Sequence, residues 1–433
     1  MVVTHQGFFD APLAEIDPAM GDIVARELTR QQTHIELIAS ENLASRAVMQ
    51  AQGSIITNKT VEGYPGKRYH GGAAVVDEME RLGIARAKEL FGCAYANLQP
   101  HSGSQANQTV LHTLLKPGDR ILSMDLSAGG HLSHGAQVNQ TGRFYDVAHY
   151  GVRRQDGLID MDEVAKRAIA HQPQMIIAGG SSYPRVIDFA AFRAIANEVG
   201  ARLLVDMAHI AGLIAGRAHP SPVPHADVVT TTTTKTLRGA RGGLIVSNDE
   251  DLGKRIDSSL FPGVQGSAHL QIMAGKTVCL GEALRPEFRD YAAAVVAHAQ
   301  VMATTLLERG YDVVTGGTDT HLLLLDLRRQ DLKGNAACDR LEAAGITSNK
   351  NAVPFDDQKP WVTSGLRLAS SSATTRGLGP DDFRRLAGLT ADVLDEMAAG
   401  GGLDGPAVSA TRAAVSEICA QHPIYPNSIV TET

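Results

Sequence analysis

Between residues 75 and 250, short apolar runs of strand length alternate with segments of helical periodicity. Met175–Ala178, Leu203–Val205 and Leu244–Val246 are three such runs, and each is followed by polar or glycine residues. This alternation is typical of a mainly parallel sheet with helices on both faces. The sequence therefore predicts an α/β domain whose functional groups lie just beyond the strand ends.

The segment from Val76 to Phe91 is the clearest helical pattern. One face of this predicted helix carries small and apolar residues, namely Val76, Met79, Gly83, Ala87 and Leu90. The charged residues Asp77, Glu80, Arg81 and Lys88 lie off that face. Gly92 is placed to end the helix, since glycine adopts the left-handed conformation that closes many helices.

From about Pro286 onward the pattern changes. Two long helices are predicted at 291–309 and 381–397, and a strand is predicted at 321–327. We therefore divide the chain into an N-terminal arm with helices at 1–50, a large cofactor domain at 51–290 and a small C-terminal domain at 291–433.

Charge and cysteine content exclude several function classes. The formal net charge is -7, whereas nucleic acids and anionic membranes bind clustered Lys and Arg. No apolar run approaches the roughly 20 residues that span a bilayer, and residues 1–18 lack the basic and apolar stretches of a targeting peptide.

The four cysteines, Cys93, Cys279, Cys338 and Cys419, have no paired spacing. We expect a cytoplasmic protein with reduced thiols, small-molecule ligands and no metal site, because no carboxylate or cysteine joins the pair His131 and His134 at ligand spacing.

Lys235 ends a run of β-branched residues, Val228 to Thr234, and is followed by a glycine-rich stretch to Gly243. The run predicts a buried strand that delivers one lysine to a turn. Burial lowers the pKa of a lysine toward the amine form that Schiff-base chemistry needs. A surface lysine at a strand end is the ordinary alternative.

Two further patterns suit a pyridoxal-phosphate site. Asp206 follows a predicted strand and could pair with the pyridinium nitrogen of that cofactor, although a strand-end Asp is as often a turn residue. Ser102 to Asn107 precedes a helical pattern at 108–115 and offers amides and hydroxyls to a phosphate, or simply a helix cap. The loop 62–72, rich in Gly, Tyr and titratable residues, is too polar for a core and is either functional or a solvated connection.

With these motifs assembled, the chain resembles the serine hydroxymethyltransferase family of fold-type-I pyridoxal-phosphate enzymes. The resemblance covers nearly the whole chain and is carried by 34–42, 62–69, 100–107, 205–209, 230–243, 349–351 and 363–367. It implies a large domain with a mainly parallel, seven-stranded type of sheet between helices, and a smaller α+β C-terminal domain. It also implies pyridoxal 5'-phosphate bound covalently to Lys235 and tetrahydrofolate as cosubstrate.

The resemblance assigns roles to residues of this sequence. His131 would stack on the cofactor ring, Asp206 would pair with its nitrogen, and Ser181 and His209 would flank its phenolic oxygen. The cofactor phosphate would be held by Ser102, Gly103, Ser104 and Gln265, with Ser267 beside them. Ser40 and Arg367 would bind the substrate carboxylate, which suits a guanidinium fork.

A folate site is implied at Glu62, Tyr69, Leu126, Gly130, Leu132 and Asn351. Glu62 is in addition a candidate proton donor or acceptor. In the family, Glu62, Tyr69 and the loop 261–267 would reach into the neighbouring subunit's site, so a homodimer is the smallest functional unit expected.

The departures from the family pattern fall on the substrate side. The residue before the cofactor lysine is normally His and here is Thr234, and two family tyrosines fall on Thr60 and His70. A family Gly falls on Ser267, the usual Pro before Arg241 is Ala240, and the Gly-Thr-Pro-Ala after Arg367 is replaced at 369–372. Three ring side chains are thus smaller here. We expect Thr60, Glu62, Tyr69 and His70 to join Ser40 and Arg367 in the substrate site, and Lys235, Glu62, Asp206, His131 and Thr234 to act in catalysis.

The smaller side chains predict a substrate that is larger at its α-carbon. We expect 2-methylserine and tetrahydrofolate to give D-alanine, 5,10-methylenetetrahydrofolate and water. The alternatives are the ordinary L-serine and glycine reaction, a folate-independent aldolase, and an inactive paralogue that acts as a scaffold.

Overall fold

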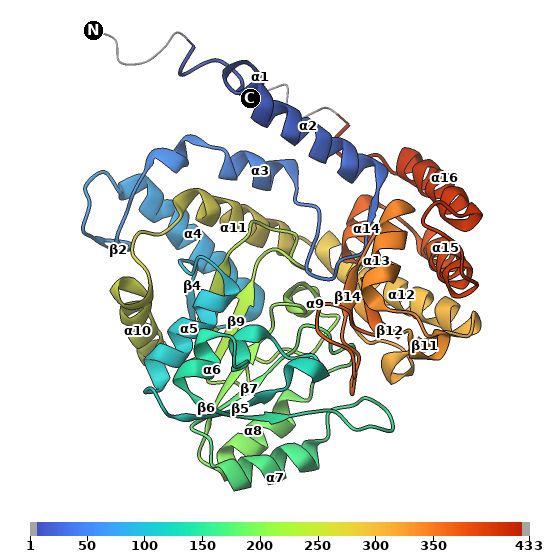
Figure 1. Cartoon of the computed structure of the whole chain (residues 1–433). Coiled ribbons are helices and arrows are strands. Elements are labelled where there is room, and N and C mark those ends of the chain that lie inside the picture. The colour runs from blue at the N-terminus through green and yellow to red at the C-terminus, as the bar shows by residue number, and fades with distance from the viewer. Residues whose placement is uncertain (1–6, 427–433) are drawn as a thin grey trace.

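The computed structural model describes residues 7–426 and is built around a seven-stranded sheet (Figure 1). The strand order is β4-β10-β9-β8-β7-β5-β6. The strands are β4 (Tyr95–Asn97), β5 (Arg120–Met124), β6 (Asp146–Tyr150), β7 (Met175–Ala178), β8 (Arg202–Asp206), β9 (Val228–Thr232) and β10 (Gly243–Ser247). Strands β6, β5, β7, β8 and β9 are parallel, and β10 is antiparallel to both β9 and β4. The predicted α/β class with a mainly parallel sheet is confirmed.

Alternate side chains of each strand enter two different cores, one on each face of the sheet. In β8, Leu203 and Val205 pack into one core and Leu204 packs into the other. The smaller core is closed by α5 (Gly103–Leu114) and α10 (Glu250–Ser258). Helices on the other face include α4 (Ala74–Phe91), α7 (Met161–His171), α8 (Phe189–Glu198) and α11 (Leu270–Ala283). Both faces are buried, so the central strands read as continuous apolar runs.

Helix α4 confirms the predicted helix and its cap, since Gly92 has a φ of 65°. Asp77 and Glu80 were predicted to lie off the apolar face of this helix. That prediction was wrong, because both lie among its buried residues and only 6% and 1% of their surfaces are exposed. Both carboxylates bind the buried guanidinium of Arg68, at 2.8 Å for Asp77. Helical spacing could not reveal this partner, which comes from the hairpin of β2 (Gly63–Tyr64) and β3 (Lys67–Arg68). The ion pairs anchor the polar loop 62–72 to α4.

Helix α5 begins at Gly103, five residues before the predicted start at residue 108. Ser102 is its N-cap, and the Ser102 hydroxyl accepts a hydrogen bond from the Gln105 amide at 3.2 Å. Ser104 to Asn107 therefore lie in the first turns of the helix and not in a loop. Polar residues with no apolar periodicity concealed these turns from the sequence pattern.

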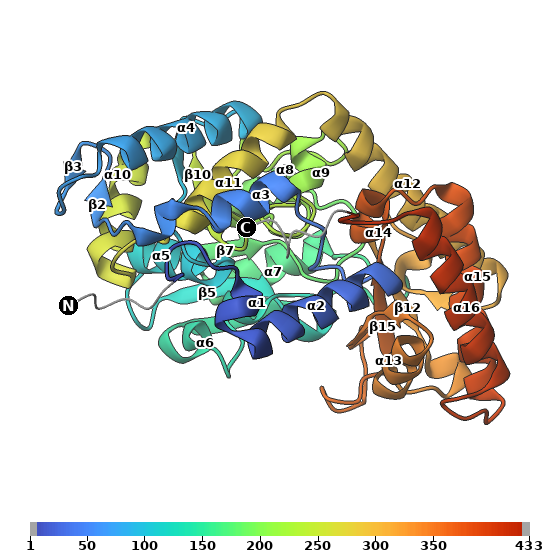
Figure 2. The same ribbon diagram turned by 90° about the horizontal axis from the view of Figure 1, so that it is seen from above.

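A second core lies beyond α12 (Glu287–Glu308), around a four-stranded antiparallel sheet. Its strands are β11 (Asp312–Val313), β12 (Leu322–Asp326), β14 (Asn349–Asn351) and β15 (Gly365–Ala369). Helices α13 (Gly334–Ala343), α15 (Pro380–Ala398) and α16 (Pro406–Gln421) cover it (Figure 2). The predicted helices at 291–309 and 381–397 and the strand at 321–327 are confirmed to within a few residues.

Helix α12 joins the two cores. Phe288 and Val295 pack into the first core, and Met302 and Leu306 pack into the second, so the predicted division at residue 290 falls within this helix. The segment β1 (Ile35–Glu36) pairs in parallel with β13 (Ile346–Thr347) of the second core. Residues 1–6 of the predicted N-terminal arm and residues 427–433 of the predicted C-terminal domain lie outside the described residues.

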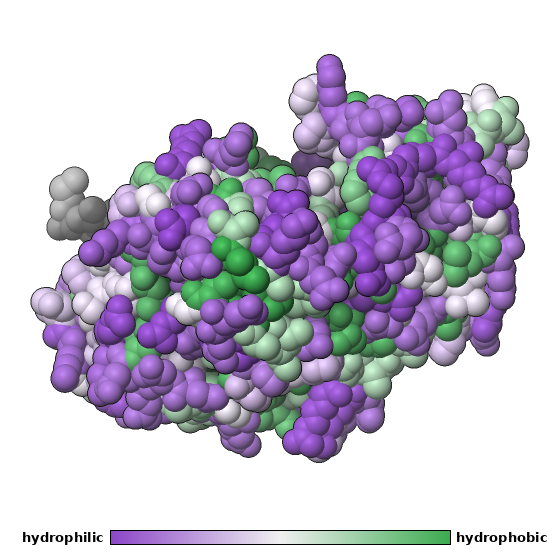
Figure 3. Space-filling model, turned by 90° about the horizontal axis from the view of Figure 1, so that it is seen from below, coloured by the Kyte–Doolittle hydropathy of each residue, from purple (hydrophilic) through white to green (hydrophobic). Residues whose placement is uncertain are grey.

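The N-terminal helix α2 (Pro18–Thr33) buries only Gly21, and Figures 1 and 2 show it along the outside of the molecule. Figure 3 shows another face, on which hydrophilic side chains surround a small apolar group. No helix within residues 7–426 is long and apolar enough to cross a membrane.

Candidate active site

Lys235 lies in a tight turn three residues after the end of β9. The turn is fixed by hydrogen bonds from the Thr233 hydroxyl to the Ala240 carbonyl at 2.6 Å and from the Gly239 amide to the Thr233 carbonyl at 2.8 Å. The Lys235 carbonyl accepts from the Asn42 side-chain amide at 2.9 Å. Burial lowers the pKa of Lys235 to about 8. Near neutral pH the lysine therefore has far more of the nucleophilic amine form than an exposed lysine.

The Lys235 amine faces a cavity at the carboxyl ends of β7, β8 and β9, where α5 begins. The residues that line it are Ser102, Gly103, Ser104, His131, His134, Gly180, Ser181, Asp206, Ala208, His209, Thr232 and Lys235. Most of the predicted cofactor residues are thus brought together in one chain. They come from five separate stretches of sequence, which the parallel strands and their crossovers gather at one sheet edge.

Asp206, the last residue of β8, is held by three donors. Its Oδ2 accepts from His134 Nε2 at 3.0 Å and from Asn107 Nδ2 at 2.8 Å, and its Oδ1 accepts from the Ala208 amide at 3.0 Å. Burial by itself raises the pKa of Asp206, but the neighbouring His134, His131 and Asn107 outweigh it and hold the pKa below its usual range. The cavity therefore contains a permanent carboxylate next to a reactive lysine.

Asn107 and His134 are site residues that sequence reasoning missed. The expectation that no carboxylate joins the pair His131 and His134 was wrong, because the fold places Asp206 beside both of them. Asp206 is distant in sequence, so the spacing of the histidines could not show it. Protein donors already occupy Asp206 Oδ2, and Ser133 lies 2.7 Å from His131 Nδ1, so the cluster is organised to orient the carboxylate.

His134 is oriented by its contact with Asp206. Only 2% of its surface is exposed, and its Nδ1 has no hydrogen-bond partner among residues 7–426. Its Nε2 donates to Asp206 Oδ2, so this buried ring holds the carboxylate in place.

The start of α5 suits a phosphate. The amides of Gly103 and Ser104 belong to the first turn, which carries no intrahelical partners for its N–H groups. Across the cavity, burial lowers the pKa of His131 to about 4, so this ring is neutral at ordinary pH. Gln265 contacts the same loop, since its Oε1 accepts from the His101 amide at 3.3 Å.

Arg367 lies next to the cavity through Ser181, whose carbonyl accepts from the guanidinium at 2.6 Å. The arginine is held by Asn349 at 3.1 Å as well.

His209 is paired with a residue not predicted for the site, His321, across 3.3 Å. Burial lowers the pKa of both rings, that of His321 to about 3. Ser40 is two residues from Asn42, which contacts the lysine turn.

None of the predicted substrate and folate residues lines the lysine cavity of the same chain, and Thr60, Glu62, Tyr69 and His70 belong to a separate loop. Tyr69 is 76% exposed and packs edge-on against Phe261 at 5.7 Å between ring centroids. Glu62 accepts a hydrogen bond from the Ser267 hydroxyl at 3.3 Å. The two loops 60–70 and 261–267 therefore form one surface.

The remaining folate candidates lie in two places. Leu126 and Leu132 are about half exposed and follow β5, with the buried Gly130 between them. Asn351 ends β14, the strand that carries the Arg367 partner Asn349. The structure thus places these groups on two separate elements.

The site has the groups that pyridoxal 5'-phosphate requires. The lysine can bind its aldehyde, the carboxylate can pair with its pyridinium nitrogen, the neutral histidine ring can stack on its ring, and the helix N-terminus can hold its phosphate. With the seven-stranded sheet and the small second domain, they define a fold-type-I pyridoxal-phosphate-dependent transferase.

Comparison with known proteins specifies the family. The family model described as serine hydroxymethyltransferase matches residues 13–390. A serine hydroxymethyltransferase from Acidiphilium cryptum is 59% identical over 96% of this chain and 97% of its own length. One from Paramagnetospirillum magneticum is 57% identical over 96% and 98% of the two chains. The chain belongs to the serine hydroxymethyltransferase family. It is a hydroxymethyltransferase that uses pyridoxal 5'-phosphate, held covalently by a lysine, with tetrahydrofolate as cosubstrate.

Proposed function

We propose that this enzyme transfers the hydroxymethyl group of 2-methylserine to tetrahydrofolate, giving D-alanine, 5,10-methylenetetrahydrofolate and water. One observation carries the proposal: Thr60, His70 and Thr234 stand where the family pattern has two tyrosines and a histidine. All three changes reduce the size of ring side chains at the substrate side, while the cofactor residues are retained.

The surroundings of these positions support extra room for a methyl group. Thr234 is half-buried and directly precedes Lys235, and its hydroxyl has no hydrogen-bond partner among residues 7–426. Thr60 and His70 lie on the exposed surface shared with Glu62 and Tyr69. Adding a methyl group to a tightly packed site costs about 1 to 3 kcal/mol, so removing ring volume favours the larger substrate.

The proposed roles follow the geometry. Lys235 would hold the cofactor, and Asp206 would keep the cofactor nitrogen protonated. When bound, the cofactor would supply an electron sink for cleavage at the α-carbon. His131 would lie on the cofactor ring, and Ser181 and His209 would lie beside the phenolic oxygen. The phosphate would be held or adjoined by Ser102, Gly103, Ser104, Gln265 and Ser267.

Substrate residues complete the site. Arg367 and Ser40 bind the substrate carboxylate, and Arg367 is suited to this because burial lowers its pKa only to about 10, which leaves it charged. Glu62 exchanges a proton with the hydroxymethyl group. Folate binds at Glu62, Tyr69, Leu126, Gly130, Leu132 and Asn351.

Stereochemistry decides the product. By resemblance to the family, the exchanged group occupies the pro-S position of glycine, so an added methyl group takes the pro-R position. Replacement of the hydroxymethyl group by a proton then yields D-alanine.

We also propose a homodimer with shared sites. The support is that Tyr69 packs on Phe261 and Glu62 accepts a hydrogen bond from Ser267. The loops 60–70 and 261–267 thus form one surface, as expected of residues that serve a neighbour. A cytoplasmic location stays a prediction from the sequence.

The second candidate is the ordinary L-serine and glycine reaction, which the names of the relatives favour. A folate-independent aldolase is the third, and intact folate residues argue against it.

The decisive experiment compares kcat/KM for 2-methylserine and L-serine, each with and without tetrahydrofolate. We expect 2-methylserine to be preferred, folate to accelerate its cleavage, and the combined Thr60→Tyr, His70→Tyr and Thr234→His variant to shift the preference toward L-serine. Thr57→Tyr is the control, because it adds a ring to the same exposed segment outside the predicted site. Preference for L-serine by the unmodified protein would refute the substrate assignment, and equal rates without folate would support an aldolase.

A further inference from the structure

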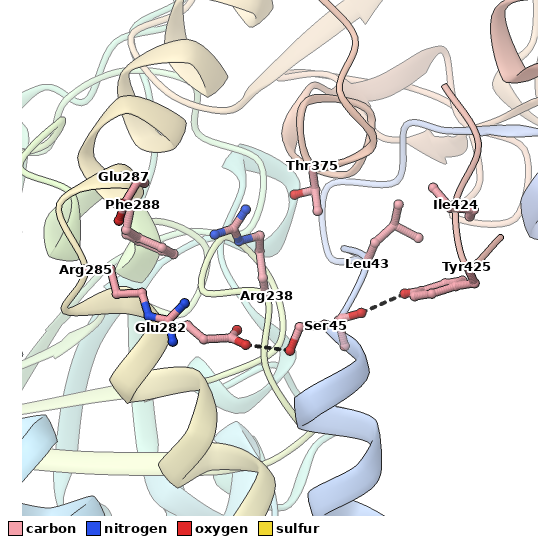
Figure 4. Close-up of a pocket in the computed structure, with 11 residues that line it drawn as sticks. Leu43, Ser45, Arg238, Glu282, Arg285, Glu287, Phe288, Thr375, Ile424 and Tyr425 are labelled. Carbon is pink, nitrogen blue, oxygen red and sulfur yellow. Dashed lines mark hydrogen bonds between the residues drawn. The ribbon is translucent and has the colours of Figure 1, made fainter. Parts of the chain in front are cut away.

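A second cavity lies behind the lysine turn and shares no lining residue with the Lys235 cavity (Figure 4). Its volume is about 400 Å³, within the range of small-molecule sites. Its walls come from residues 43–45, from the junction of α11 and α12, from α14 (Ser371–Arg376) and from residues 424–425. It is therefore a separate concave site built from segments far apart in the chain.

Arg238 supplies a positive charge to this cavity. Its guanidinium carbon lies 4.0 Å from the ring centroid of Tyr291 and 5.1 Å from that of Phe288. Within residues 7–426, no carboxylate comes within 4.0 Å of this guanidinium, and its N–H groups have no acceptor. The aromatic rings fix the cation in place and leave its donors for a carboxylate ligand.

Glu282 supplies the opposite charge. Its Oε1 accepts a hydrogen bond from the Ser45 hydroxyl at 2.6 Å, as Figure 4 shows. This bond orients the carboxylate and leaves acceptor capacity for a second donor. Arg285 and Glu287, both exposed, add one charge of each sign to the lining.

The cavity is thus neutral overall but carries both signs, and Leu43, Phe288 and Ile424 form apolar walls. A simple anion would be repelled by Glu282, and a simple cation would be repelled by Arg238. We propose that the cavity binds a zwitterionic α-amino acid with an apolar side chain, whose carboxylate pairs with Arg238 and whose ammonium group pairs with Glu282.

A ligand bound in this cavity would contact residues that are hydrogen-bonded to the lysine turn. The Arg238 amide donates to the Lys235 carbonyl at 3.1 Å. Asn42 donates both to that carbonyl and to the Tyr291 hydroxyl, at 2.9 and 2.8 Å, and Leu43 of the cavity follows Asn42. The bound amino acid therefore contacts both segments that fix the Lys235 backbone, which makes the cavity a regulatory site.

The test uses holoenzyme whose Schiff base has been reduced with borohydride, so that amino acids cannot exchange onto the cofactor. Calorimetric titration with L-leucine is compared with 4-methylpentanoate and 3-methylbutylamine, which keep the apolar body and lack one charge each. We expect L-leucine to bind at one site per chain, with at least tenfold weaker binding of both analogues. No binding of L-leucine, or equal affinity for the three ligands, would overturn the proposal.

Variants locate the site. Arg238→Gln and Glu282→Gln should each weaken L-leucine binding at least tenfold, and the rim variant Arg285→Gln should change it less than threefold. Glu282→Gln keeps the Ser45 contact and lies outside the lysine turn, so its loss of affinity cannot come from a disturbed Lys235. Binding that survives Glu282→Gln but is lost in Arg367→Lys would belong to the substrate site and would refute the inference.

Discussion

Replacing His134 by leucine should weaken cofactor binding while leaving the fold intact. In the structure, Asp206 Oδ2 has two side-chain donors, His134 Nε2 at 3.0 Å and Asn107 Nδ2 at 2.8 Å. A hydrogen bond to a charged group contributes about 1.5 to 3 kcal/mol. Because Asn107 and the Ala208 amide remain, we take the lower half of that range, about 1.5 to 2 kcal/mol, which is roughly a 10- to 30-fold loss of affinity.

The assay is reconstitution of apoenzyme with increasing pyridoxal 5'-phosphate, followed by absorbance, together with kcat and KM. His134→Gln is the matched control, because its amide nitrogen can occupy the place of Nε2 and keep the donor. We expect the glutamine variant to retain most of the affinity that leucine loses. Nitrogen NMR of His134 should show the proton on Nε2 in the unmodified protein.

Two outcomes would refute this reasoning. Unchanged cofactor affinity in His134→Leu would show that the hydrogen bond to Asp206 does not help to hold the cofactor. Equal losses in the leucine and glutamine variants would show that the ring matters for its shape and not for its donor. Thermal unfolding of both variants separates these outcomes from a general loss of stability.

Four further predictions concern other residues. Borohydride reduction and peptide mapping should place the cofactor on Lys235, and a label on any other lysine would contradict the assignment. Asp206→Asn should keep the fold but lose most of the turnover, because an unprotonated pyridine is a poor electron sink; near-normal turnover would contradict it. Burial lowers the pKa of Lys276 to about 7, so between about pH 7 and its ordinary value of 10.5 the unfolded chain binds more protons and this group makes stability rise with pH. Urea unfolding of Lys276→Met at pH 7 and pH 9 should show a smaller rise than the unmodified protein, and an equal rise would refute the burial argument. Gly179→Ala should destabilise the protein by about 2 to 5 kcal/mol, because φ is +122° and a Cβ there would lie 2.2 Å from the Asp206 carbonyl; an unchanged melting temperature would contradict this.

The sequence alone predicted the elements that depend on local patterns. Strand β7 was predicted to the residue, and α4 was predicted with its Gly92 cap, since apolar periodicity and a glycine stop are both read within one element. The start of α5 was missed, because its first turns are polar and are stabilised by the Ser102 cap and by the sheet behind them.

The same division holds for the candidate site. Lys235, Asp206 and Ser102 could be found from sequence because each follows or precedes an element with a clear pattern. Asn107, His134 and His321 could not, because each is an ordinary polar residue whose partner is distant in the chain. The partners of His134 and His321 are Asp206, 72 residues away, and His209, 112 residues away.

The sequence by itself thus determined which chemical groups the protein has and which strands and helices carry them. Periodicity and motifs are properties of neighbouring residues, so they survive without a fold. Only the tertiary structure decided that Asp206 stays ionised, that His134 serves as its donor, and that Arg68 buries itself against Asp77. Those outcomes depend on burial and on contacts between distant segments, and both arise only when the parallel strands bring their carboxyl ends to one edge.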